Sequence, residues 1–220
     1  MMALEVYWAS GSPFSWRVLL TLEVKQLPYQ SKLLTFSQRE HKSPEYLALN
    51  PRGKVPTLKD DDFLLYESLA IMTYLDSKYP ERPLFGRTPQ EIGTIWRLVS
   101  EGISYVCDPI GRVVGPLFFG GAAEKETEIR TAATAVYAEL VRLEAVVTES
   151  PWLAGEAISA ADIVVYPWMQ MLLRAAAKEA AKPLNLEFLP FDARYPHLAA
   201  WVKHIEAIPG YERTYPPHWR

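Results

Sequence analysis

The pattern of apolar residues changes near residue 80, and this change constrains the fold more than any other feature of the sequence. Before it, segments of helical periodicity alternate with short β-like runs, which are Leu4–Ala9, Tyr29–Leu34, Val55–Lys59 and Phe63–Tyr66. After it, only helical periodicity recurs. The sequence therefore predicts an α/β unit followed by an all-α unit.

Prolines and a glycine mark the boundary between the two predicted units. The residues concerned are Pro80, Pro83, Gly86 and Pro89. Because such residues break or fix the backbone, we expect a linker over residues 81–90. An N-terminal domain is then expected over residues 1–80 and an all-helical domain over 91–220. A chain of 220 residues is long enough for two unequal domains.

The helical half contains one clear local signal. Four helices are expected there, over residues 95–106, 124–147, 160–178 and 196–208. Ser159 can cap the third helix through its hydroxyl, and the Asp162 carboxylate can accept from the Ser159 amide in return. This pair predicts a structural cap. A flexible loop between the first two helices is predicted from Gly115, Pro116, Gly120 and Gly121.

The charge balance bears on the kind of partner. Lys and Arg number 23 against 26 for Asp and Glu, so the net charge is −3. A chain with so little excess charge has no general basic field for nucleic acid or for an acidic membrane. The most apolar stretch is interrupted by Asp162, Pro167 and Gln170, and we expect neither a membrane span nor a targeting signal.

The single cysteine, Cys107, cannot form an internal disulfide. One thiol is also too few for a zinc knuckle, an iron–sulfur cluster or a Cys-x-x-Cys redox pair. We therefore expect a reducing, cytoplasmic setting and no metal site built on cysteine.

Three segments of the N-terminal half carry a family resemblance. They are Ser-Pro-Phe-Ser-Trp-Arg-Val at 12–18, His-Lys-Ser-Pro-Glu-Tyr-Leu-Ala-Leu-Asn-Pro-Arg-Gly-Lys-Val-Pro at 41–56, and Tyr-Glu-Ser-Leu-Ala-Ile at 66–71. In this order and spacing they resemble the cytosolic glutathione S-transferases, of the serine type, with features similar to the phi and zeta classes. The resemblance implies an α/β thioredoxin-like domain that binds glutathione, followed by an all-α helical domain.

Glu67 and Ser68 are placed to hold one end of glutathione. A helix that begins at Ser68 presents unpaired amides and a positive dipole end to the γ-glutamyl carboxylate. Glu67 can then meet the ammonium group. The alternative is that both residues only cap their helix, since an acidic residue is favourable at that end.

The resemblance assigns the rest of glutathione to the middle segment. It implies a cis bond before Pro56, with the Val55 backbone pairing with the ligand backbone; an ordinary trans turn after Gly53 is the alternative. It also implies that His41, Lys42 and Lys54 reach the glycine carboxylate, and the alternative is solvated surface. Phe14, in the first segment, is expected to contact the substrate. Arg52 and Lys54 depart from the aromatic residue and Gln that are usual there.

Ser12 is the candidate catalytic residue, because it follows the first strand at the spacing of the serine in serine-type members. A thiol of pKa about 8.5 needs about 2.7 kcal/mol to become mostly thiolate at neutral pH. One hydrogen bond to a charged group supplies about 1.5 to 3 kcal/mol. Tyr7, Ser10 and Ser15 remain alternatives, although Ser15 suits the N-cap of the first helix better.

The resemblance implies a homodimeric enzyme that conjugates the glutathione thiolate to a small hydrophobic electrophile, a detoxifying reaction. Glutathione is then a co-substrate, and no metal or redox cofactor is expected. An isomerase of the maleylacetoacetate type is one alternative, and a non-catalytic protein that binds glutathione or another ligand is the other. Candidates for the electrophile pocket are Tyr105, Val113, Phe118 and Phe119, although residues at such spacing more often belong to a plain core.

Overall fold

The computed structural model describes residues 4–220, which form two units. The first contains the residues up to Pro83 together with Ala207–Arg220, and the second contains Leu84–Glu206. The predicted division differs from this one at the C-terminus, because it assigned every residue from 91 onward to the helical domain. Residues 207–220 instead pack on the α/β unit.

The first unit is built on a four-stranded mixed sheet. Its strands are β1 (Leu4–Ala9), β2 (Tyr29–Leu34), β3 (Thr57–Asp60) and β4 (Phe63–Tyr66). Their order is β2-β1-β3-β4, with β1 and β2 parallel and β3 antiparallel to β1 and β4. The predicted α/β unit is therefore confirmed. β3 begins two residues later than expected, after Pro56, because proline cannot donate to the strand ladder.

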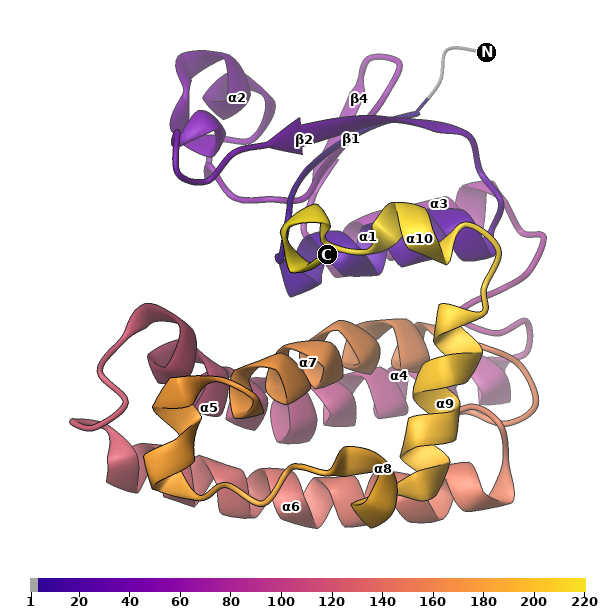
Figure 1. Cartoon of the computed structure of the whole chain (residues 1–220). Helices are drawn as coiled ribbons and strands as arrows, with labels where there is room; N and C mark the ends of the chain where they lie inside the picture. Colours follow the sequence, from indigo (N-terminus) through magenta and orange to yellow (C-terminus); the bar gives the residue numbers. More distant parts are fainter. Residues whose placement is uncertain (1–3) are drawn as a thin grey trace. The chain divides into compact units, whose positions relative to one another are not determined.

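Two helices cover one face of this sheet (Figure 1). They are α1 (Pro13–Val24) and α3 (Ser68–Lys78). Along the chain, η1 (Glu40–Lys42) and α2 (Pro44–Leu49) connect β2 to β3. The core between sheet and helices includes Val6, Leu19, Leu58, Ile71 and Leu75, all at most 1% exposed. α1 is buried almost all round, as expected for a helix covered on both sides. Its outer side contacts α10 (Tyr211–Thr214), which is followed by η4 (Pro217–Trp219).

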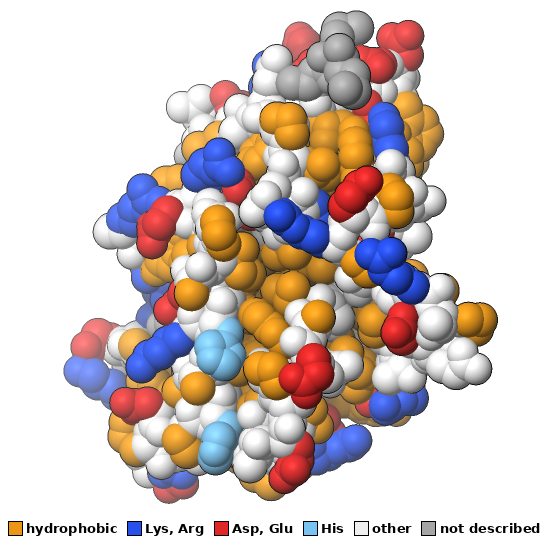
Figure 2. Space-filling view, turned by 90° about the vertical axis from the view of Figure 1, so that its right-hand side faces the viewer, with side chains coloured by type: hydrophobic (Ala, Val, Ile, Leu, Met, Phe, Trp, Pro, Cys, Tyr) orange, Lys and Arg blue, Asp and Glu red, His pale blue; other side chains and the backbone are white. Residues whose placement is uncertain are grey.

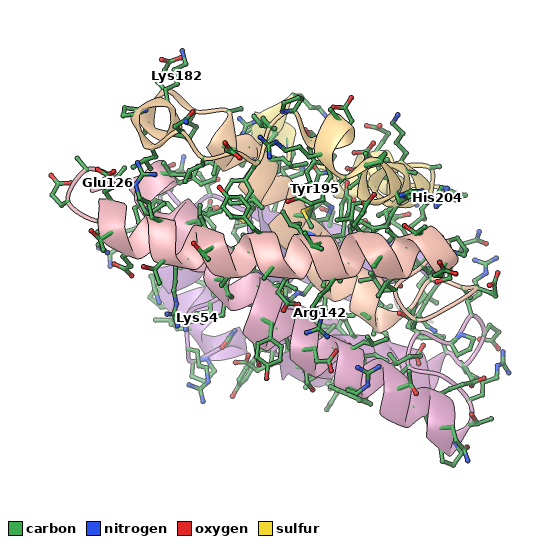
Figure 3. The ribbon with its side chains drawn as sticks, turned by 90° about the horizontal axis from the view of Figure 1, so that it is seen from below. Lys54, Glu126, Arg142, Lys182, Tyr195 and His204 are labelled. Atoms are coloured by element: carbon green, nitrogen blue, oxygen red, sulfur yellow. The ribbon has the colours of Figure 1, made fainter. Side chains whose placement is uncertain are left out.

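The second unit is all-helical, as predicted. Its elements are α4 (Pro89–Glu101), the π-helical turn η2 (Gly102–Cys107), α5 (Asp108–Phe119), α6 (Glu126–Glu149), α7 (Ala160–Ala176), η3 (Glu179–Leu184), α8 (Phe191–Arg194) and α9 (Pro196–Glu206). α6 crosses the whole unit, with Glu126 near one end and Arg142 further along (Figure 3).

The flexible loop predicted at Gly115 and Pro116 is wrong, since both residues lie inside α5. Helix continues through Pro116 because Val113, Val114 and Leu117 bury their side chains in the core, and this packing outweighs the local cost of proline. The chain leaves the helix only at Gly120, where φ is 94°.

The cap predicted before α7 is present and extends further than expected. Asp162 is fully buried, and its carboxylate accepts from the Ser159 amide at 2.9 Å and from the Ser159 hydroxyl at 2.8 Å. It also accepts from the Leu153 amide at 2.9 Å and from Nε1 of Trp201 at 2.8 Å. Burial raises the pKa of Asp162, and these four donors oppose the rise. One carboxylate therefore joins α7 to α9 and to the preceding loop.

Acidic and basic side chains are interspersed on the face drawn in Figure 2, where no broad area carries a single sign. This distribution agrees with the net charge of −3. Over residues 4–220, no helix is long and apolar enough to cross a membrane.

Candidate active site

Strand register brings the three sequence motifs to one end of the sheet. Thr57, the first residue of β3, is paired with Tyr7 on β1 and with Tyr66 on β4. The loop after β1, the Val55–Pro56 peptide before β3, and the residues after β4 therefore emerge side by side. This end of the sheet carries Ser12, Pro56 and Glu67, although they lie far apart in the sequence.

Ser12 is the N-cap of α1. Its hydroxyl oxygen accepts a hydrogen bond from the Ser15 amide at 3.2 Å, and its backbone is extended, with φ −77° and ψ 115°. Pro13 follows at the first helical position, where a missing N–H costs nothing. The cap uses a lone pair of the Ser12 oxygen and leaves the hydroxyl proton for another acceptor. Ser12 is half-buried.

The expectation that Ser15 caps the first helix is wrong. Ser15 lies within the first turn of α1 and is 0% exposed. Helix begins earlier than its apolar pattern suggests because Pro13 has its φ already near the helical value. The Ser15 side chain is consequently shut away from solvent.

The other two hydroxyls near the end of β1 have partners within the first unit. Tyr7 donates to Oε2 of Glu5 at 2.9 Å, and burial together with this bond raises the pKa of Tyr7 to about 12. Ser10 Oγ lies 2.5 Å from Nδ1 of His218, in the C-terminal segment.

The loop before β3 is fixed by side chains that the sequence analysis did not single out. Tyr46 donates to the Lys54 carbonyl at 2.6 Å and is hydrogen-bonded to the Thr57 hydroxyl at 2.7 Å. Asn50 donates to the same carbonyl at 2.8 Å. The predicted cis peptide between Val55 and Pro56 is present. Nothing local in the sequence indicates where the Asn50 amide points.

Glu67 and Ser68 stand at the N-terminus of α3, as predicted. Ser68 is the first helical residue and is 6% exposed, whereas Glu67 occupies the cap position without a capping hydrogen bond from its side chain. Glu67 has φ 73°, which strains a residue other than glycine. Strain of this kind, about 1–3 kcal/mol, concentrates at ligand sites. The first amides of α3 have no acceptor within the helix.

A long ion pair joins two of the three motifs. Nε of Arg52 lies 3.9 Å from Oε1 of Glu67, and both side chains are about two-thirds exposed (66% and 69%). An exposed pair of this length stabilises the fold by about 0–1 kcal/mol at most. Its importance lies in placing a cation beside the segment expected to hold glutathione, a role that the sequence analysis did not give to Arg52.

The residues expected at the glycine carboxylate lie on the segments around Gly53. A Cβ on Gly53, where φ is 55°, would lie 2.8 Å from Nζ of Lys42 and 2.9 Å from the His41 carbonyl oxygen, so these segments touch. Lys42 also donates to the Arg52 carbonyl at 3.3 Å. Burial, followed by the charge of Lys42, lowers the pKa of His41. Lys54 is exposed on the loop before β3 (Figure 3).

Phe14 and the expected pocket residues differ widely in exposure. Phe14, on the first turn of α1, is 45% exposed, with the Arg17 guanidinium 5.2 Å from its ring centre. Val113 is wholly buried and belongs to the core, whereas Phe119 is 89% exposed. The Phe118 ring faces Nζ of Lys178 at 4.9 Å.

Across residues 4–220, no cluster of three or more His, Cys, Asp or Glu side chains is arranged to hold a metal ion. Cys107 is buried in the helical unit, with its sulfur 3.7 Å from the Val164 carbonyl oxygen.

Family models match both units. A model described as glutathione S-transferase, N-terminal domain, matches residues 11–78, and one described as glutathione S-transferase, C-terminal domain, matches residues 106–209. Glutathione S-transferase A of Pleuronectes platessa is 29% identical over 221 residues, which cover 98% of this chain and 92% of that protein. Glutathione S-transferase theta-2B of Homo sapiens is 31% identical over 227 residues, covering 99% and 86%.

A solved structure agrees in fold and in length. The crystal structure of a glutathione S-transferase from the Antarctic clam Laternula elliptica superposes with a TM-score of 0.84 at 29% sequence identity, and covers 99% of this chain and 94% of that one. The fold, the arrangement of the motifs and these relatives lead to one conclusion: the chain belongs to the glutathione S-transferase family and is a transferase that uses glutathione.

Proposed function

We propose that Ser12 stabilises the glutathione thiolate, which then attacks a small hydrophobic electrophile. The observation that carries this proposal is the cap geometry of Ser12. Because its oxygen accepts from the Ser15 amide, its O–H is available to donate to a sulfur anion. Ser12 also stands at the positive end of α1, which favours an anion further.

The other hydroxyls near β1 are less suited to the task. Ser15 is buried, and Ser10 is engaged by His218. Tyr7 already donates to Glu5, and its raised pKa makes it a weaker acid than an ordinary tyrosine. To donate to the thiolate, Tyr7 would have to give up its hydrogen bond to the Glu5 carboxylate, and a carboxylate is a strong acceptor.

The proposed reaction begins when the bound thiol loses its proton to solvent. The Ser12 hydroxyl donates to the resulting thiolate and keeps its own proton. The sulfur lone pair then forms a bond to carbon of the electrophile. In a substitution, the leaving group departs with its bonding pair; in an addition, the pair moves along the electrophile and is protonated from water. Binding contributes by holding the reactants together.

Binding of glutathione is proposed to use the motifs gathered at the sheet end. The first amides of α3 and Ser68 hold the γ-glutamyl carboxylate, and Glu67 meets the ammonium. The Val55 backbone pairs with the peptide, and the remaining contacts, including the glycine carboxylate, come from Phe14, His41, Lys42, Lys54 and Pro56. The strained backbone of Glu67 supports this placement.

We further propose that the protein is a cytoplasmic homodimer whose product is a detoxified, more water-soluble conjugate. The buried single cysteine fits a reducing compartment. Apolar side chains on β4, Phe63 at 47% and Leu64 at 36% exposed, offer a surface for the second copy.

Ser12→Ala tests the proposal. Glutathione affinity should change little, whereas the pKa of the bound thiol should rise by roughly one to two units, with roughly a ten- to hundredfold fall in turnover of an aryl halide at neutral pH. Turnover should recover in part at higher pH. The measurement is the pH dependence of thiolate absorbance and of rate.

Ser43→Ala is the matched control, because Ser43 caps α2 through the same 3.2 Å contact and is also followed by proline. It removes an equivalent cap without removing the proposed donor. The proposal is wrong if Ser12→Ala keeps the wild-type profile while Tyr7→Phe loses it. A wild-type protein that binds glutathione without any thiolate at neutral pH would instead be a carrier.

A further inference from the structure

The C-terminal segment of the chain reaches the loop that carries Ser12. Nδ1 of His218 lies 2.5 Å from Oγ of Ser10, two residues before Ser12. A Cβ on Gly11 would lie 2.8 Å from Cε1 of the same imidazole. The His218 ring thus packs on both residues that separate β1 from Ser12.

The segment that carries His218 is held firmly on α1. Nε1 of Trp16, in the first turn of α1, donates to the Thr214 hydroxyl at 2.9 Å, and Thr214 is 1% exposed. The rings of Tyr215 and Trp219 contact Trp16 edge-on, at 5.8 Å and 5.5 Å between centres. His218 therefore lies between two residues, Tyr215 and Trp219, that are packed on one tryptophan.

The residues that His218 contacts form a tight turn directly before Ser12. Gly11 has φ 81°, a conformation that residues other than glycine rarely adopt. The Ser12 amide donates to the Ala9 carbonyl at 3.2 Å and closes a tight turn around Ser10 and Gly11. Since Ser10 sits inside this turn, a bond to its side chain restrains the turn as a whole.

We propose that His218 is a positioning residue for catalysis, which acts by holding the Ser10–Gly11 turn so that the Ser12 hydroxyl stays aimed at the glutathione sulfur. This inference rests on the proposed role of Ser12. It adds that the C-terminal segment forms part of the active-site architecture of the first unit. The mechanism requires a hydrogen bond to Ser10, and it does not require a charge on the imidazole.

A double-mutant cycle between positions 10 and 218 tests the inference. His218→Ala should lower kcat/KM for an aryl halide by about three- to tenfold, the effect of one lost hydrogen bond, and raise the pKa of the bound thiol. Ser10→Ala should do the same. The double variant should be no worse than either single one, because both remove one interaction. Glutathione affinity, measured by calorimetry, should stay within about twofold.

His218→Asn separates positioning from charge, because the asparagine amide can occupy the place of Nδ1 and is neutral. It should restore most of the activity and the thiol pKa. His204→Ala is the matched control, since His204 is an exposed histidine of the second unit, and it should behave as wild type. The inference is overturned if His218→Ala leaves the thiol pKa unchanged, if the two single effects add, or if His218→Asn resembles His218→Ala.

Ser12→Ala distinguishes failure of the inference from failure of the proposed function. If Ser12→Ala shifts the thiol pKa but the cycle shows no coupling, Ser12 acts without His218 and only the inference fails. If Ser12→Ala has no effect while Ser10→Ala removes the thiolate, Ser10 is the donor and both fail. If positions 10 and 218 are coupled and Ser12→Ala shifts the pKa of the bound thiol, the results support both the inference and the proposed function.

Discussion

Four residues near the end of β1 carry a hydroxyl, and each hydroxyl has different contacts. Ser12 caps α1 and retains a proton to donate, Ser15 is buried one turn later, and Ser10 is bound by His218. Tyr7 is committed to Glu5. The four hydroxyls lie close together in sequence, yet their contacts give them different roles.

At the residue scale, we predict that Glu67→Ala combined with Ser68→Ala weakens glutathione affinity at least about tenfold, because each lost charge-assisted bond costs about 1.5–3 kcal/mol. Isothermal calorimetry measures the change. Asp62→Ala, which removes an exposed acid from the turn before β4, should leave the affinity unchanged. Equal affinities for the double variant and wild type, with both folded, would refute the assignment.

Elements of the helical unit are joined by two buried or half-buried carboxylates. Asp162 ties α7 to Trp201 on α9, and Glu144 on α6 receives the first amides of α9. Oε1 of Glu144 accepts from the His197 amide at 3.0 Å, and Oε2 accepts from the Leu198 amide at 2.8 Å. A carboxylate at a helix N-terminus satisfies amides that have no partner within that helix.

At the element scale, Asp162→Ala should lower the free energy of unfolding by about 3 kcal/mol or more, since it leaves several buried donors without an acceptor. Ser159→Ala removes only the cap hydroxyl and should cost about 1 kcal/mol. Urea denaturation followed by tryptophan fluorescence provides both values. Similar losses in the two variants would show that the contacts to Leu153 and Trp201 contribute little.

A second prediction at this scale concerns pH. Burial raises the pKa of Glu144, but the amides of His197 and Leu198 and the His197 ring outweigh it, and the pKa lies below its ordinary value. A carboxyl whose pKa is lowered by folding stabilises the native state above the unfolded pKa, about 4.3. That contribution is lost as the pH falls through the lower, folded pKa.

Glu144→Gln should therefore be less stable than wild type by about 1–2 kcal/mol at pH 7, and the difference should shrink below about pH 4. Denaturation midpoints from pH 3 to pH 7 measure this trend. Glu128→Gln, on an exposed site of the same helix, should track wild type throughout. If the difference in stability between Glu144→Gln and wild type stayed the same from pH 3 to pH 7, the loss would be steric rather than ionic.

At the scale of the whole molecule, residues 207–220 belong to the α/β unit although they follow the helical unit in the sequence. Arg213 forms an ion pair with Glu23, a carboxylate only 2% exposed that also accepts from the Tyr29 hydroxyl at 2.8 Å. Glu23 lies on α1, whose outer side is covered by this segment.

At this scale, we predict that Arg213→Ala destabilises the protein by about 1–3 kcal/mol, since it leaves the Glu23 carboxylate buried without its cation. Arg220→Ala, whose partner Glu212 is exposed, should cost about 0–1 kcal/mol. Chemical denaturation of both variants measures these losses in the free energy of unfolding. Equal midpoints would mean that water reaches Glu23 and replaces the arginine.

The proposed homodimer belongs to the same scale. Sedimentation should give twice the mass of one chain at micromolar concentration, and Phe63→Asp, which places a charge on the exposed apolar surface of β4, should shift the protein toward the monomer. A wild-type protein that sediments as a single chain would contradict the homodimer. Asp61→Ala, in the adjoining turn, should leave the mass unchanged.

Local patterns in the sequence were enough for the order of strands and helices in the α/β unit, for the cap at Ser159 and Asp162, and for the motifs that identify the family. These features depend on neighbours in the chain: the alternation of apolar residues, a hydroxyl three residues from an acid, a proline after a serine. They could be predicted because the interactions that produce them close within one or two turns of backbone.

Only the tertiary structure decided the rest. Packing of Val113 and Leu117 kept Pro116 inside a helix, and strand register placed Ser12, Pro56 and Glu67 at one end of the sheet. The contacts of Asn50 with the Lys54 carbonyl, of Arg213 with Glu23, and of His218 with Ser10 likewise depend on where distant segments meet. A sequence pattern carries no record of such partners, because burial and side-chain direction are set by the assembled core rather than by the adjacent residues.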